Sequence, residues 1–125
     1  MAAETRTKSL RDMQEEATAW CHANGWYDEP VPFPLAVALL HSEVSEALEA
    51  WRQWGTEDAT MPVAHLDGTG NLDGPPKPEG VGSEFADLLI RLLDYAHRFG
   101  VDLEAEYRRK MAFNQTRPYR HGKRA

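Results

Sequence analysis

Two stretches of the sequence decide the fold, HSEVSEALEAW (His41–Trp51) and EFADLLIRLLDYA (Glu84–Ala96). Both place apolar residues at the three- and four-residue spacing of an α-helix. Both also carry two acidic residues one helical turn apart. These acidic residues are Glu43, Glu46, Glu84 and Asp87. The two stretches therefore predict two amphipathic helices, each presenting a pair of carboxylates.

The flanking sequence predicts two more helices, one on each side of this pair. Helical spacing of apolar residues, proline in a first turn, and capping Ser, Asp and Gly residues set the expected ends. The expected helices run from about Thr5 to Asn24, from Pro34 to Trp54, from Ser83 to Gly100, and from Asp102 to Gln115. The prediction is a single all-α domain over residues 1–125, a bundle of about four helices with an irregular basic tail over residues 116–125.

A long connection separates the two acidic helices. From Gly55 to Gly82 the sequence has six Gly and four Pro in 28 residues, and neither a helical nor a strand period persists there. The prediction is a long Gly/Pro-rich loop over about residues 55–82, and loops of such length in small domains often serve a function.

Composition limits the class of protein. The chain is 42% hydrophobic and 27% charged, which predicts a folded globular chain. Its longest apolar run, Leu35–Leu40, is too short to cross a membrane. Cys21 is the only cysteine, which excludes an internal disulfide and a cysteine-rich zinc site. A cytoplasmic location is the expectation.

Charge is unevenly distributed along the chain. The net charge is −6, yet the stretch from Arg108 to Ala125 has seven Lys or Arg and no acid. An acidic body with a basic end indicates an anionic partner or self-assembly. The negative net charge and the few aromatics in the basic stretch argue against a nucleic-acid binder.

The four carboxylates are unusual because they share helix faces with apolar residues. Glu43 and Glu46 project to the same face as Leu39 and Leu40. Burying like charges together is costly unless a cation neutralises them. If the two helices pack antiparallel, four hard oxygen ligands converge, a donor set that suits Mg²⁺ or Mn²⁺. The alternative is a pair of solvated acidic helix faces, and the residues leave both interpretations open.

These residues carry a family resemblance. The motifs Glu43-x-x-Glu46 and Glu84-x-x-Asp87, with the closing KMAFNQTRPYRHGK (Lys110–Lys123), resemble the MazG-like members of the all-α nucleoside triphosphate pyrophosphohydrolases. The resemblance implies a MazG-like bundle that assembles as a homodimer or homotetramer. It also implies Mg²⁺-dependent hydrolysis of a nucleoside triphosphate between its α and β phosphates, in the cleansing of nucleotide pools.

The resemblance also assigns roles to residues. It implies that the acids of both motifs, Glu43, Glu46, Glu84 and Asp87, hold the metal. We expect Glu43 and Glu46 to be catalytic, with Glu46 as the general base.

Several further residues are candidates for substrate contacts. Phosphate and sugar contacts are expected from Lys110, Asn114, Arg117 and Arg91, and stacking on the base from Trp26 and Trp54. The alternatives are a solvated basic helix end for the first three, and a salt bridge to Asp87 or Asp94 for Arg91. Trp20 and Trp51 are expected in the core.

A second class of function fits the same sequence. The helices could form a non-catalytic dimerisation or interaction module whose acidic faces bind a basic partner. Divalent cations would stabilise an enzyme of the first kind and leave the second unaffected.

Overall fold

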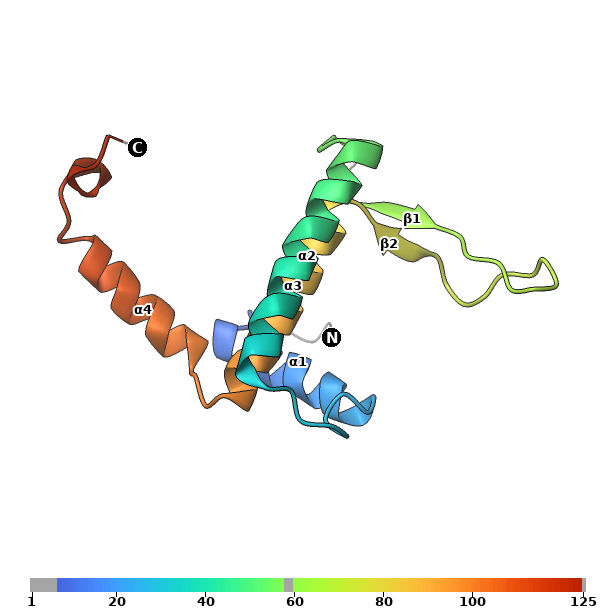
Figure 1. The fold of residues 1–125 in the computed structure, drawn as a ribbon, viewed down its shortest axis with the longest axis horizontal. Coiled ribbons are helices and arrows are strands. Elements are labelled where there is room, and N and C mark those ends of the chain that lie inside the picture. Colours follow the sequence, from blue (N-terminus) through green and yellow to red (C-terminus); the bar gives the residue numbers. More distant parts are fainter. Residues whose placement is uncertain (1–6, 58–59, 125) are drawn as a thin grey trace, which may run out of the picture. The chain divides into compact units, whose positions relative to one another are not determined.

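The computed structural model describes residues 7–57 and 60–124, and these are mostly helical (Figure 1). The elements in chain order are α1 (Leu10–Ala23), α2 (Phe33–Trp54), β1 (Met61–Val63), β2 (Lys77–Glu79), α3 (Val81–Arg98), α4 (Leu103–Asn114) and the 3₁₀ turn η1 (Tyr119–Gly122). The four predicted helices are confirmed, three of them within a few residues at their ends. Helix α1 begins at Leu10, after its cap Ser9, later than expected, and the expected start at Thr5 lies outside the described residues. By internal contacts the chain divides into unit 2, Glu29–Leu92, and unit 1, which consists of the segments before and after it.

Helix α2 is the longest element of unit 2. It follows Pro32 and has Pro34 in its first turn, where the missing N–H has no helical partner to lose. Its buried residues are Ala36, Glu43, Ala47 and Ala50. This face is the one predicted around Glu43. The prediction that this charged residue lies on the apolar side of the helix is therefore confirmed. Glu46, expected on the same face, is exposed at its edge.

The predicted long loop contains a β-hairpin, and the all-α expectation is corrected to that extent. Strand β1 pairs antiparallel with β2, with Met61 opposite Glu79 and Val63 opposite Lys77. At the far end, Asp67 Oδ1 accepts hydrogen bonds from the backbone N–H and the hydroxyl of Thr69, which closes the turn. Strands of three residues with a central proline lack the alternation from which a strand is recognised in sequence, so the prediction missed them.

Helix α3 begins two residues earlier than predicted. Ser83 lies inside the helix and is not its N-cap; its hydroxyl donates to the carbonyl of Pro78 (2.9 Å). Gly80 joins strand to helix with φ +115°, a backbone conformation that side chains with a Cβ rarely adopt. The hairpin and the first turn of α3 are therefore held together directly.

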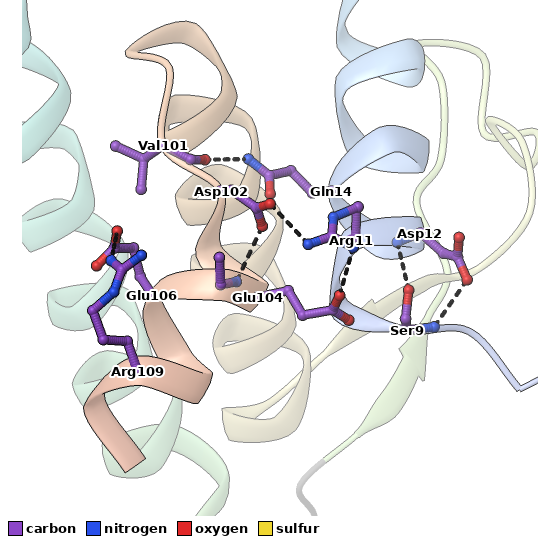
Figure 2. A network of polar contacts seen from close by, with 10 residues as sticks. Ser9, Arg11, Asp12, Gln14, Val101, Asp102, Glu104, Glu106 and Arg109 are labelled. Carbon is purple, nitrogen blue, oxygen red and sulfur yellow. Dashed lines mark hydrogen bonds and ion pairs between the residues drawn. The ribbon is translucent and has the colours of Figure 1, made fainter. Parts of the chain in front are cut away.

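In unit 1, helix α1 begins with a capping box and α4 with a side-chain cap (Figure 2). Ser9 and Asp12 exchange hydrogen bonds at the start of α1, and Asp102 accepts from the backbone of Ala105 as predicted. Arg11 pairs with Asp102 (2.8 Å) and with Glu104 (3.0 Å). The cap and this pairing lower the pKa of Asp102, with the cap contributing most. Helix α4 is thus tied to α1 at its first turn.

The second half of α3 is fixed to the segment after α1 by a buried carboxylate. Asp94 is 3% exposed and accepts hydrogen bonds from the Tyr27 hydroxyl (2.6 Å) and from Arg98 Nε (3.0 Å). Arg98 also donates to the carbonyl of Trp26 (2.7 Å) and lies over the Tyr27 ring. Burial and the bond to Asp94 raise the pKa of Tyr27 to about 12. This network fixes the segment that follows α1 to the second half of α3.

Several apolar side chains expected to be buried are exposed. Trp20 and Trp51 are 55% and 53% exposed, which corrects their assignment to the core. In the apolar stripe of α3, Leu93 and Ala96 are buried, but Leu89 and Ile90 are each 41% exposed. The reason is physical: a periodic stripe predicts that a helix has an apolar face but does not say what covers it.

No helix within residues 7–57 and 60–124 is both long and apolar enough to cross a membrane.

Replacing the buried carboxylate tests the Asp94 network. Asp94→Ala leaves the Arg98 guanidinium, whose side chain is 10% exposed, without its partner. Breaking a buried ion pair from one side costs about 3 kcal/mol of unfolding free energy. Urea unfolding followed by circular dichroism measures the change. Arg109→Ala, which removes a solvent-exposed ion pair with Glu106, is the control and should cost much less. Equal losses in the two variants would contradict the assignment.

Candidate metal centre

Three of the four predicted acidic ligands come together in unit 2. Glu43, Glu84 and Asp87 each offer a carboxylate oxygen, and these oxygens all lie within 4.8 Å of one another. The fourth residue, Glu46, is outside this group and exposed. The structure therefore brings one carboxylate from α2 together with two from α3.

The helices place these side chains in a simple way. Glu43 lies in the middle of α2 on its buried face, at 6% exposure. Glu84 and Asp87 lie three residues apart in the first turns of α3, so they project to one side of that helix. Chain direction reverses between α2 and α3 through the hairpin (Figure 1). The predicted convergence of the two motifs is confirmed for these three residues.

Burial makes the Glu43 carboxylate costly to ionise. Its pKa is raised, chiefly by burial and then by the neighbouring carboxyls of Glu46 and Asp87, while the positive charge of Arg91 opposes the shift. Glu43 Oε1 pairs with Arg91 Nε at 2.5 Å. Glu43 Oε2 is buried and has no hydrogen-bond partner among the described residues. Burial removes the hydrogen bonds of this oxygen to water, and no protein donor replaces them. The oxygen is therefore available to a cation.

The pKa of Glu84 is raised by the same two causes, burial and neighbouring carboxylates. Burial raises its pKa most, and the charges of Asp87, Glu46 and Glu79 raise it further. Lys77 acts in the opposite direction. Glu46 thus contributes to the potential at both Glu43 and Glu84, although it is not one of the three converging groups. The carboxylates together form a region that favours positive charge.

The donor set fits a hard divalent cation. All three converging groups are carboxylates, and no neutral nitrogen or sulfur ligand belongs to the group that the described residues form. Mg²⁺ and Mn²⁺ prefer such oxygen ligands. The unpartnered Oε2 of Glu43 is an independent sign that Arg91 does not satisfy this carboxylate fully. Glu43, Glu84 and Asp87 would hold the ion, with Glu46 close by.

Arg91 has a different partner from those expected. The predicted salt bridges were to Asp87 or Asp94; the structure pairs Arg91 with Glu43 across the two helices. Asp94 is instead engaged by Tyr27 and Arg98. Arg91 is four residues after Asp87, so it projects from the same side of α3 and reaches α2 directly. It partly neutralises the acidic group and is still 35% exposed at its side chain.

The other expected substrate residues are distributed over both units. Lys110 and Asn114 lie on α4 and Arg117 follows it, all in unit 1, with Arg117 near the Phe113 ring. Trp26, 55% exposed, also belongs to unit 1, whereas Trp54 is half-buried at the end of α2 in unit 2. These five residues stay predictions as substrate contacts.

Sequence reasoning missed the charged residues of the hairpin. Glu79 is paired with Lys77 (3.6 Å) and with His65 (3.7 Å). The signal that could have indicated them is proximity in sequence, because Lys77 and Glu79 come just before the Glu84 motif.

Divalent cations should stabilise the wild-type chain through these carboxylates. A ligand that binds only the folded state adds about 2.7 kcal/mol at a free concentration 100-fold above its Kd. We expect Mn²⁺ to raise the thermal midpoint of the wild type by several degrees and to have little effect on Glu43→Gln. Differential scanning calorimetry measures both. The control is Glu49→Gln, an exposed acid of α2 paired with Arg52, which should respond like the wild type. An equal response of Glu43→Gln would refute the site.

The raised pKa values also predict how stability depends on pH without metal. The folded chain binds protons at Glu43 and Glu84 more tightly than the unfolded chain does. Their contribution is therefore greatest below the ordinary pKa of 4.5 and is lost as the pH rises through the folded pKa values. In EDTA, Glu43→Gln should become more stable relative to the wild type as the pH rises above 4.5, the ordinary pKa of the glutamate side chain. Urea unfolding at a series of pH values checks this, and a constant difference would contradict it.

No protein-family model, no curated protein and no solved structure matches this chain. The geometry of the acidic group and the resemblance of the two motifs are therefore the observations that bear on function.

Proposed function

We propose that the chain is a Mg²⁺-dependent nucleoside triphosphate pyrophosphohydrolase with a MazG-like bundle, Mn²⁺ being an alternative cation. It hydrolyses the α–β phosphate bond of a nucleoside triphosphate, a deoxynucleotide or a non-standard nucleotide, to a monophosphate and pyrophosphate in the cytoplasm. Such an activity clears unwanted nucleotides from the pool. The observation that carries the proposal is the convergence of Glu43, Glu84 and Asp87, with a buried oxygen of Glu43 left unpartnered.

Charge explains why such a site suits a triphosphate. A triphosphate and a group of carboxylates repel each other and can meet only through bridging cations. A divalent cation supplies charge neutralisation at phosphate oxygens and an acidified water. The chain's own residues hold and orient: Glu43 from α2, and Glu84 and Asp87 from α3, fix three ligand oxygens on two packed helices. Arg91 orients Glu43 through their ion pair.

Glu46 has the placement of a general base. It lies one turn after Glu43 on α2, is exposed, and is close enough to affect the pKa values of Glu43 and Glu84. Since it is outside the converging trio, its carboxylate is free to accept a proton from an attacking water. Glu43 supports the reaction as a ligand at the reacting centre. Lys110, Asn114, Arg117 and Arg91 are proposed for phosphate and sugar contacts, and Trp26 and Trp54 for stacking on the base.

We also propose that the chain works as a homodimer or homotetramer. Val44, Leu48 and Trp51 form an exposed apolar stripe on α2, each about half exposed, and Phe85 of α3 is 58% exposed. A stripe at helical spacing can pair with its own copy about a two-fold axis, because both copies present the same surface. The resemblance of the motifs to a family of dimers and tetramers supports a second copy as the occupant.

The same stripe favours the second candidate function, a non-catalytic helical dimerisation or interaction module. An interaction module needs the exposed apolar surface but not the unpartnered oxygen of Glu43. Hydrolysis assays therefore separate the two candidates.

Removing the negative charge of Glu46 should abolish turnover without affecting the fold. Glu46→Gln keeps the size of an exposed side chain but cannot accept the proton, so we expect kcat to fall at least about a hundredfold. A panel of canonical and modified triphosphates with Mg²⁺, scored for pyrophosphate against phosphate release, measures the activity. Glu49→Gln on the same helix is the control and should retain it. Near wild-type turnover in Glu46→Gln would overturn the assignment of the base, and phosphate release instead of pyrophosphate would overturn the reaction.

A charge in the apolar stripe should dissociate the oligomer. Leu48→Glu places a carboxylate in the proposed interface, where its desolvation is costly. Light scattering after size-exclusion chromatography should show monomers, whereas Gln53→Glu, at an exposed polar position of α2, should leave the assembly intact. A monomeric wild type would contradict the proposal.

A further inference from the structure

We propose that Lys77, on strand β2 of the hairpin, binds a phosphate group of the same ligand that the metal centre of unit 2 binds. This inference rests on the proposed function and names a contact for its substrate class, the polyphosphate group of a nucleotide bound with a divalent cation. In the resting structure Lys77 pairs with Glu79, and on binding it exchanges this carboxylate for a phosphate oxygen.

The hairpin is fixed to the helix that carries two of the ligands. The Ser83 hydroxyl donates to the carbonyl of Pro78 on β2 (2.9 Å), and the backbone N–H of Glu84 donates to the carbonyl of Gly80 (3.0 Å). Gly80 is buried and turns the chain from strand into helix. The end of β2 is thus hydrogen-bonded to the turn that presents Glu84, so the two cannot be placed independently.

The strand register decides which face of the hairpin carries the charge. Residues directly opposite each other in an antiparallel pair share a face, and so do residues two apart along one strand. Met61, Val63, Lys77 and Glu79 therefore lie on one face, and Pro62 and Pro78 on the other. The first face includes three half-buried residues, whereas both prolines are exposed. Lys77 accordingly shares with Glu79 the half-buried face of the hairpin, although its own side chain is mostly exposed.

The Lys77–Glu79 pair is loose enough to exchange. Its N–O distance is 3.6 Å, longer than a hydrogen bond, and the Lys77 side chain is 63% exposed while that of Glu79 is 18% exposed. Ion pairs in contact with water contribute little free energy, so a phosphate oxygen with more charge can displace the carboxylate. His65, 3.7 Å from the same oxygen of Glu79, can take over part of the pairing when it is protonated.

Charge balance makes Lys77 the cation best placed for this role. The sequence of unit 2 contains three Lys or Arg and eleven Asp or Glu. Arg52 pairs with Glu49 on α2, and Arg91 pairs with Glu43. Strand β2, on which Lys77 lies, is hydrogen-bonded to the first turn of α3, which carries Glu84, and the Lys77 charge opposes the rise in the pKa of Glu84. A phosphate chain bound through cations at Glu84 therefore meets the Lys77 ammonium with the least rearrangement.

Binding of Mn²⁺ alone and of inorganic triphosphate with Mn²⁺ separates this inference from the proposed function. The proteins compared are the wild type, Lys77→Ala, Lys77→Arg and Arg52→Ala, by electron paramagnetic resonance for the ion and by calorimetry for triphosphate. We expect Mn²⁺ alone to bind all four within about twofold. Affinity for Mn²⁺-triphosphate should fall at least about tenfold in Lys77→Ala, recover in Lys77→Arg, and stay unchanged in Arg52→Ala.

Three results would overturn the inference. If the wild type binds Mn²⁺ and Mn²⁺-triphosphate and Lys77→Ala binds both equally well, Lys77 makes no phosphate contact and the proposed function stands. If Lys77→Ala weakens Mn²⁺ alone to the same degree as Mn²⁺-triphosphate, Lys77 supports the metal centre and not the phosphate. If the wild type binds no Mn²⁺, both the proposed function and this inference fail.

Discussion

The structure of unit 2 depends on one constraint, the burial of the Glu43 carboxylate against α3. An ionised carboxylate taken out of water needs positive charge close by. The chain provides a single ion pair to it, from Arg91, and leaves its second oxygen unpartnered among the described residues. Glu84 and Asp87 add negative charge at the same place. Protonation or a bound cation would relieve this repulsion, and the unpartnered oxygen is why we propose a cation-binding site.

The hairpin between α2 and α3 adds further charged residues close in sequence to the Glu84 motif. A chain could join two antiparallel helices with a few residues, yet here the connection forms a two-stranded sheet whose end is hydrogen-bonded to the first turn of α3. Its half-buried face carries a carboxylate, Glu79, with two basic partners, Lys77 and His65. Basic side chains in weak ion pairs near a candidate metal site suit a polyphosphate substrate, whose negative charge the metal ions neutralise only in part.

The two units are stabilised by different interactions. In unit 1 every buried charge described has a partner: Asp94 binds Tyr27 and Arg98, and Glu104 binds Arg11. In unit 2 the buried face of α2 consists of three alanines and Glu43, while larger apolar residues such as Leu48 and Phe85 stay exposed. Apolar surface of this kind on packed helices is typical of chains that assemble with further copies.

The sequence by itself determined the four helices and the apolar face of α2 on which Glu43 lies, because helical periodicity fixes which side chains share a face. The convergence of the two acidic motifs depended on how the helices pack, and the tertiary structure brings Glu43, Glu84 and Asp87 together without Glu46. It did not reveal the hairpin, since three-residue strands containing proline have no alternating pattern. It also placed Trp51 in the core, because periodicity shows that a face is apolar without showing what covers it. Only the tertiary structure decided that Lys77 lies on a hairpin hydrogen-bonded to the first turn of α3 and that Arg91 pairs with Glu43, since strand pairing and a contact between two helices depend on packing and not on helical periodicity.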